Sequence, residues 1–116
     1  MVQRVLKEKS YLFSVRIVKL TQYLTSTKQE YVLSKQTLRS GTAIGALIRE
    51  AEFAQSNADY INKFSVALKE ANETKYWIEL LKDTDYIEEI LFKSLFNDVK
   101  EIIAILVSTI KTLKKK

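Results

Sequence analysis

Apolar residues recur along this chain at alternating intervals of three and four positions, in four long segments separated by short polar breaks. Since an α-helix has about 3.6 residues per turn, this spacing gathers the apolar side chains of each segment into one stripe. The segments predict helices over residues 3–24, 28–55, 58–82 and 85–113. Four such helices joined by short turns favour an all-α fold, an antiparallel up-down-up-down four-helix bundle in which residues 1–116 form one domain.

The polar breaks contain residues that are typical of helix starts. Thr27 followed by Glu30 has the form of a capping box, in which both side chains bond amides at the start of the second helix. Ser56 or Asn57 is expected to cap the third helix. An aspartate in the break 82–85 is placed to stabilise the fourth helix through its dipole.

Both glycines of the chain, Gly41 and Gly45, lie four residues apart in the predicted second helix. Glycine inside a helix costs about 1 kcal/mol relative to alanine, so two on one face require a compensating contact. A helix face without side chains lets a neighbouring backbone come close, and we interpret the pair as a tight crossing of two helices. The alternative is a ligand or a nucleic-acid backbone that lies against the same groove.

Two further features predict surfaces that other molecules cover. Trp77 lies off the main stripe of its helix, so it either seals the flank of the bundle or meets another subunit. The stripe of the last helix is wider than three neighbouring helices require. Surplus apolar surface of this kind is typical of self-association.

The composition excludes most catalytic chemistry. The chain has no cysteine and no histidine, which excludes disulfides, thiolate zinc sites, Ser-His-Asp triads and the Glu-x-x-His ligand pairs of di-iron bundles. Glu70 and Glu73, three residues apart, could hold a hard cation, but ion pairs with Lys63, Lys69 or Lys75 are the simpler interpretation. We therefore expect no enzymatic activity, no metal and no cofactor.

The sequence also indicates where the protein resides. Its first residues contain no apolar run of signal-peptide length, and its most apolar run, 102–107, is far shorter than the ~20 residues of a membrane span. The absence of cysteine suits a reducing compartment. We expect a cytoplasmic protein.

The net charge of +5 is concentrated in the first 28 residues, which hold six basic residues and one acidic residue. Lys9, Arg16 and Lys19 share a face without an acid on their own helix, and an uneven basic surface is typical of proteins with an anionic partner. The predicted nucleic-acid contacts are Arg4, Lys7, Lys9, Arg16, Lys19 and Lys28. Alternatively, the basic face pairs with acids of a neighbouring subunit, such as Glu88 or Asp98, or its lysines only solvate the surface.

The central part of the chain carries motifs of a known family. The motifs are Leu38-Arg39-Ser40-Gly41-Thr42-Ala43-Ile44-Gly45-Ala46 and Tyr76-Trp77-Ile78-Glu79-Leu80-Leu81, with further matches at residues 50–52, 55–56, 59–60, 63–64, 67–71 and 73–74. They resemble the bacterial four helix bundle family, often labelled 23S rRNA intervening-sequence protein. The resemblance covers the second and third predicted helices in detail and the other two by pattern. It departs at Leu47, where relatives commonly carry asparagine.

The resemblance implies an antiparallel four-helix bundle that assembles into a homopentamer and has no known enzymatic activity. Some members of the family are encoded inside intervening sequences of 23S rRNA genes. A similar fold serves as the accessory protein of diversity-generating retroelements, where a basic pentamer binds nucleic acid and a reverse transcriptase. If the asparagine of relatives makes a polar contact, Leu47 replaces that contact by packing.

Two functions follow as hypotheses. The first is a non-enzymatic, basic, oligomeric scaffold that binds RNA or other nucleic acid without strong sequence specificity, since the chain contains no base-reading motif. The second is a protein–protein adaptor that docks a partner through the apolar flanks around Trp77 and the last helix.

Overall fold

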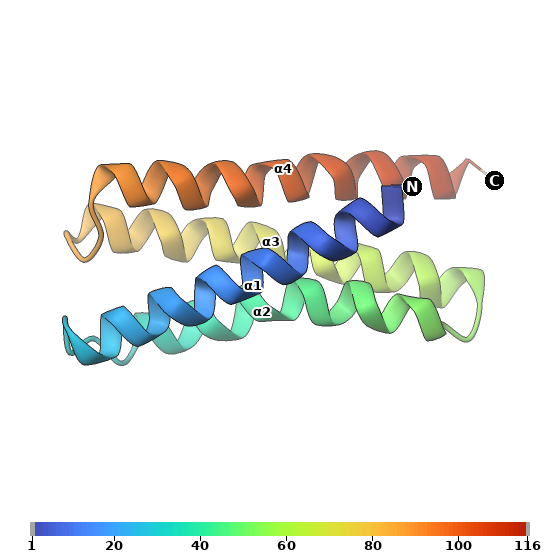
Figure 1. The fold of residues 1–116 in the computed structure, drawn as a ribbon. Helices are drawn as coiled ribbons and strands as arrows, with labels where there is room; N and C mark the ends of the chain where they lie inside the picture. The colour runs from blue at the N-terminus through green and yellow to red at the C-terminus, as the bar shows by residue number, and fades with distance from the viewer. Residues whose placement is uncertain (1, 116) are drawn as a thin grey trace.

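Four long antiparallel helices and one short 3-10 turn make up the computed structural model, which describes residues 2–115 (Figure 1). The elements are α1 (Val2–Ser26), α2 (Leu33–Glu50), η1 (Ala51–Phe53), α3 (Asn57–Asp83) and α4 (Glu89–Lys114). None of residues 2–115 lies in a strand, so the predicted all-α four-helix bundle is confirmed. Within the same residues, no helix has the length and apolarity that crossing a membrane requires.

The bundle is an elongated rod that measures 47 × 22 × 19 Å. The start of α1 and the end of α4 lie at the same end of the rod (Figure 1). Helix α1 packs closely on α2 but crosses the bundle obliquely, so it contacts α4 less extensively than α2 contacts α3. Of the four pairs of neighbouring helices in the bundle, α1 and α4 therefore have the least extensive contact.

The predicted apolar stripes fill the core. The largest fully buried side chains come from all four helices and include Phe13, Ile17, Ile44, Phe64, Ile78, Leu95 and Ile102. Helix α2 contributes mainly small residues, and its buried Ser40 hydroxyl is hydrogen-bonded to Thr74 of α3 at 2.9 Å. No buried side-chain nitrogen or oxygen in the described part of the chain lacks a hydrogen-bond partner. The small polar residues thus allow close packing of α2 without an unsatisfied group.

Helix α2 begins at Leu33, five residues later than predicted. The prediction that Thr27 and Glu30 form a capping box at its start was therefore wrong. Residues 27–32 form a linker in which Gln29 adopts a positive φ of 54°. Glu30 is buried and stabilises the helix start from within this linker. Its carboxylate accepts hydrogen bonds from the backbone amides of Val32, Leu33 and Ser34 at 3.1, 2.8 and 2.7 Å. At its other end α2 stops at Glu50 rather than at residue 55, and η1 follows it.

The starts of the other two helices differ in how well they were predicted. Ser56 caps α3 as expected, because its hydroxyl accepts a hydrogen bond from the Asp59 amide at 3.1 Å. Helix α4 begins at Glu89, so the predicted start at residue 85 was wrong. Asp85 lies in the turn at a φ of 68°, and Glu89 is the acid in the first turn of α4.

Candidate functional site

Gly41 and Gly45 lie where α2 crosses α1. A Cβ atom at Gly41 would lie 2.9 Å from both Cγ atoms of Ile17, and one at Gly45 would lie 3.2 Å from the carbonyl oxygen of Ser10. Ile17 is fully buried, and its β-branched side chain has little freedom to turn away. The structure therefore places Gly41 inside a close helix crossing, with Gly45 at the edge of that crossing.

Four of the six cations that the sequence singled out are bound to carboxylates of the same chain. The pairs are Arg4–Glu8 at 3.5 Å, Lys7–Glu52 at 2.6 Å, Lys9–Glu101 at 3.3 Å and Arg16–Asp98 at 2.6 Å. The acids of two pairs come from α4, which supplies the negative charge that the face of α1 lacks. Asp98 thus pairs with Arg16 inside one chain. Among residues 2–115, only Lys19 and Lys28 of this set have no carboxylate within 4.0 Å.

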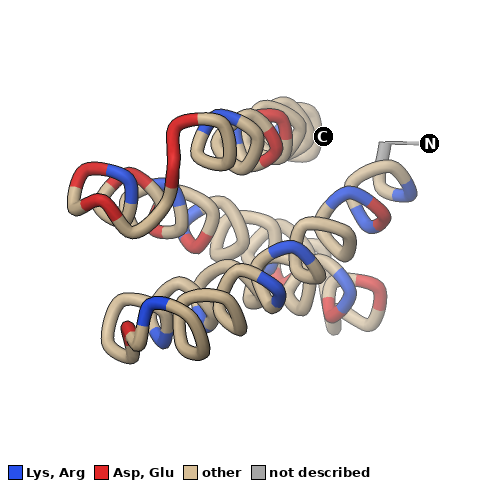
Figure 2. The backbone as a smooth tube through the Cα atoms, turned by 60° about the vertical axis from the view of Figure 1, so that its left-hand side comes forward, with Lys and Arg blue, Asp and Glu red and all other residues tan. Residues whose placement is uncertain are grey.

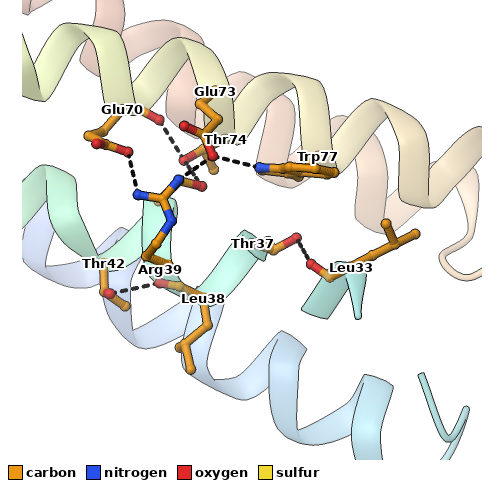
Figure 3. Close-up of polar contacts among 10 residues, drawn as sticks. Leu33, Thr37, Leu38, Arg39, Thr42, Glu70, Glu73, Thr74 and Trp77 are labelled. Atoms are coloured by element: carbon orange, nitrogen blue, oxygen red, sulfur yellow. Dashed lines mark hydrogen bonds and ion pairs between the residues drawn. The ribbon is translucent and has the colours of Figure 1, made fainter. Parts of the chain in front are cut away.

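A polar network joins α2 to α3 (Figure 3). Arg39 of α2 forms ion pairs with Glu70, at 3.2 Å, and with Glu73. The indole nitrogen of Trp77 donates a hydrogen bond to the same Glu73 carboxylate at 2.9 Å. The half-buried Trp77 thus lies along the flank of α3 with its polar atom satisfied by its own helix. The predicted lysine partners of the two glutamates were wrong, since Arg39 takes that role.

The network shifts two pKa values. The pKa of Glu73 is lowered from its ordinary value of 4.5, chiefly by the hydrogen bond from Trp77 and next by the hydrogen bond from Arg39. The pKa of Arg39 is raised, chiefly by its hydrogen bond to Glu73. In residues 2–115, no three acidic side chains come together in a way that could hold a metal ion.

We expect the fluorescence of Trp77, the only tryptophan of the chain, to titrate with a midpoint below pH 4.5 because its indole bonds the Glu73 carboxylate. Since the pKa of Glu73 is lowered on folding, the stability that it contributes is present above pH 4.5 and is lost as the pH falls through the lowered pKa. Arg39→Gln removes one of the contacts that lower the pKa of Glu73, so the midpoint of the fluorescence titration moves up towards pH 4.5 in this variant. Arg49→Gln, in the same helix, leaves the midpoint in place. An unchanged midpoint in Arg39→Gln would contradict the role of the guanidinium.

Lysines gather along the α3–α4 side of the bundle. We call Lys75 and Lys82 of α3 and Lys93, Lys100, Lys111 and Lys114 of α4 the lysine row. Spacings of seven and eleven residues put the first three α4 lysines on one side of that helix, over a length of about 27 Å. Lys75 and Lys100 both lie over the ring of Phe96, at 5.4 and 5.7 Å from its centre. The lysines of the two helices therefore share one surface.

Acidic side chains are scarce along the middle and far end of the lysine row. Lys82 and Lys93 pair with Glu89 at 3.4 and 3.7 Å, next to the α3–α4 turn, and Glu79 lies one helical turn from both α3 lysines. In the part of the chain that the structure describes, the remaining four lysines of the row have no carboxylate within 4.0 Å. Four acids of α3 and α4 pair instead with cations of α1 and α2, so, among residues 2–115, most lysines of the row keep their charge without a carboxylate nearby.

The acids at the α3–α4 turn form a cluster at one end of the lysine row. They are Asp83, Asp85, Glu88 and Glu89, and Figure 2 shows them at the end of the bundle that lies away from the termini. The end with the termini carries Lys111, Lys114 and Lys115. Along α4 the charge thus changes from acidic at the α3–α4 turn to basic at the end that carries the termini.

A cleft of about 540 Å³ lies between α1, α2 and η1, beside Gly45. Its aromatic residues are Tyr11 and Phe53, and the side chain of Phe53 is 84% exposed. The guanidinium of Arg49 lies over the Tyr11 ring, 5.4 Å from the ring centre. The remaining lining consists of Lys7, Ser14, Thr42, Ala46 and Glu50.

Comparison with known proteins identifies the family. The family model described as 23S rRNA-intervening sequence protein matches residues 4–108. The chain belongs to this family. A crystal structure of a protein with unknown function from the S23 ribosomal protein family of Bacteroides thetaiotaomicron is similar to it, with a TM-score of 0.94, 57% sequence identity, and coverage of 96% of this chain and 99% of that chain. Among curated proteins, none is significantly similar to this chain.

On this member of the 23S rRNA-intervening sequence protein family, five of the ten large apolar side chains that are exposed in the described part of the chain lie on α1. They are Val5, Tyr11, Leu12, Val18 and Tyr23. On the last helix, where the sequence predicts a surplus of apolar surface, Ile103, Ile105 and Leu113 are half-buried and pack against the core. Among the described residues of α4, Ile90 is the one large apolar side chain that is exposed.

Sequence reasoning missed the lysine row and all of the cleft except the groove beside Gly45. Beyond residue 28 the basic and acidic residues are equal in number, which concealed a row that only the side-by-side packing of α3 and α4 creates. The seven-residue and eleven-residue spacing of Lys93, Lys100 and Lys111 was the available signal. For the cleft the available signal was Gly45, whose pairing with Gly41 left a ligand in the groove as an alternative, but its walls come from segments that are 28 or more residues apart.

Proposed function

We propose that this protein is a non-enzymatic scaffold that binds the phosphate backbone of RNA, or of other nucleic acid, without strong sequence specificity. The observation that carries the proposal is the lysine row, in which four of six lysines have no carboxylate within 4.0 Å among residues 2–115. Lysine contacts to phosphates supply most of the affinity of such complexes, while they carry no sequence information. The row therefore has the chemistry of a backbone-binding surface.

The lysine row also has a favourable geometry for this role. Its lysines rest on apolar rings, as Lys82 does on Phe92 at 5.1 Å, and such contacts hold a long side chain while its charged end stays in water. The row follows a straight helix, so its charges lie along a line as phosphates do. By contrast, most of the cations predicted at α1 already form ion pairs with carboxylates of the same chain. A nucleic acid would have to break these pairs before it could bind there.

We propose further that the scaffold self-associates through α1, with a second copy of the chain as the occupant of its outward face. The inward face of α1 is apolar and fills the core, while Leu12 and Val18 are 63% and 39% exposed on the other side. A helix that is apolar on both sides is typical of one that is covered on both sides. Each added copy would repeat the lysine row and raise the affinity for a long polyanion.

Fluorescence anisotropy with a labelled RNA hairpin tests the proposal. The affinity is expected to fall by about 50- to 150-fold between 50 and 200 mM salt, as for four phosphate contacts. The triple variant Lys93→Glu, Lys100→Glu, Lys111→Glu is expected to lower the affinity by about 100-fold or more at low salt, because it reverses the centre of the row. Light scattering on the same protein is expected to give a mass above the 13.4 kDa of one chain.

The matched control is the triple variant Lys19→Glu, Lys28→Glu, Lys35→Glu, which has the same change in net charge away from the row. It includes two of the cations predicted from the sequence, so it also tests that location. We expect it to retain most of the affinity. An absence of RNA binding at low salt, or an equal loss in both variants, would contradict the role of the row, and a monomeric mass would contradict self-association.

A further inference from the structure

The cleft between α1, α2 and η1 has an exposed aromatic wall that the packing of the bundle does not use. Phe53 stands on the short turn η1 and is 84% exposed, although it is one of the most apolar side chains of the chain. Tyr11, which is 54% exposed, belongs to the same cleft. Exposed aromatic rings at the rim of a cleft are the platforms on which single-stranded nucleic acids stack their bases.

Arg49 gives the same cleft a cation that no acid neutralises. Its guanidinium lies over Tyr11, and within the described residues it has no carboxylate within 4.0 Å. Each of the nearby acids has a lysine partner, because Glu52 pairs with Lys7 of the cleft at 2.6 Å and Glu50 of the cleft pairs with Lys63 at 4.0 Å. A guanidinium fits a phosphate group with two parallel hydrogen bonds. The site thus favours an aromatic anion over a neutral apolar molecule.

Two hydroxyl groups of the cleft have free acceptor positions. Ser14 donates its proton to the carbonyl of Ser10 at 3.0 Å, and Thr42 donates to the carbonyl of Leu38 at 2.7 Å. Their oxygens can still accept hydrogen bonds, and the amino groups of nucleobases are donors. Because Gly45 and Ala46 are small, the cleft keeps a volume of about 540 Å³, which lies within the range of about 300–1,000 Å³ of small-molecule sites.

We infer that this cleft binds a nucleotide, with the base stacked on Phe53 and the phosphate held by Arg49. The site is separate from the lysine row and needs no other copy of the chain. A nucleotide at the end of an RNA, or one unstacked from its neighbours, offers the same base and phosphate as a free mononucleotide. The inference therefore goes beyond the proposed function and can hold or fail independently of it.

Binding of AMP, followed by amide shifts in NMR spectra of the ¹⁵N-labelled protein, tests the inference. We expect AMP to shift the amides around Gly45 and Ala46, and to bind more tightly than adenosine or ribose 5-phosphate, each of which supplies only half of the contacts. Phe53→Ala and Arg49→Gln are each expected to weaken AMP binding by about tenfold, as for the loss of one base–aromatic stack or one charged contact. Circular dichroism checks that both variants remain helical.

Two control variants distinguish AMP binding in this cleft from AMP binding elsewhere on the protein. Ile90→Ala removes an 83% exposed apolar side chain in the first turn of α4 and is expected to leave AMP binding unchanged. The lysine-row triple variant is also expected to bind AMP normally, so loss of RNA binding and loss of AMP binding are distinguishable. The inference is overturned if AMP causes no shifts at millimolar concentration, if ribose 5-phosphate binds as tightly as AMP, or if Phe53→Ala lowers the mass of the protein because the cleft is a contact between copies.

Discussion

Replacing Gly41 by leucine is expected to destabilise the bundle by about 3 kcal/mol, because even a single methyl group at this position would overlap the buried Ile17 side chain. Gly41→Ala tests the contact with Ile17 through the addition of a single methyl group. Gly41→Ala gains about 1 kcal/mol of helix propensity but has a Cβ atom 2.9 Å from two carbon atoms of Ile17, so we expect a net loss of about 1 kcal/mol. Urea unfolding followed by circular dichroism measures both variants.

A double-mutant cycle isolates the contact between Gly41 and Ile17. In an Ile17→Ala background both Cγ atoms are removed and only the Cβ atom of residue 17, at 3.3 Å, stays near position 41. Gly41→Ala is therefore expected to stabilise the protein there by less than about 1 kcal/mol. Ala46→Gly, at an exposed position of the same helix, measures the difference in helix propensity between alanine and glycine where no other helix crosses. If Gly41→Ala stabilised the unmodified protein as much as it does in the Ile17→Ala background, the two helices would not be in close contact here.

Removing the Glu30 carboxylate is expected to lower the free energy of unfolding by about 2–3 kcal/mol, because Glu30→Ala would leave three backbone amides at the start of α2 without their charged acceptor. Glu30→Gln keeps one acceptor oxygen in place and should lose less. Both are measured by denaturant unfolding at neutral pH.

Glu88→Ala is the matched control for Glu30→Ala. Glu88 precedes α4 as its N-cap residue but makes no capping hydrogen bond with its side chain, and it is exposed. A change within about 0.5 kcal/mol is expected, as for other surface positions. Equal effects of the two substitutions would show that Glu30 acts only through its charge near a helix start.

The helices could be predicted because each one buries a stripe that repeats at the helical period. Leu6, Phe13, Ile17 and Leu24 of α1 were placed on one face by spacing alone, and all four are buried. The start of α2 could not be predicted in this way. Residues 28–32 contain no glycine or proline. The start of α2 at Leu33 is set by the buried Glu30 side chain, whose position depends on tertiary packing.

The electrostatic surfaces could be predicted only in part. The sequence showed that the face of α1 with Lys9 and Arg16 has no acid of its own, but their partners Glu101 and Asp98 are more than 80 residues away. Which acids meet which cations depends on the order and rotation of the helices, which the spacing of apolar residues leaves open. For the same reason, Glu70 and Glu73 could be assigned to the third helix, while Arg39 could not be predicted as the partner that they share.

The segregation of charge along the rod makes the molecule an electric dipole. Acids are concentrated at the α3–α4 turn, and Lys111, Lys114 and Lys115 lie at the opposite end of an axis 47 Å long. A polyanion exerts a torque on such a dipole and turns the lysine end forward before the two molecules touch. Since ions screen the field over about 8 Å in physiological salt, this rotation is confined to the final approach, where it selects the orientation of first contact.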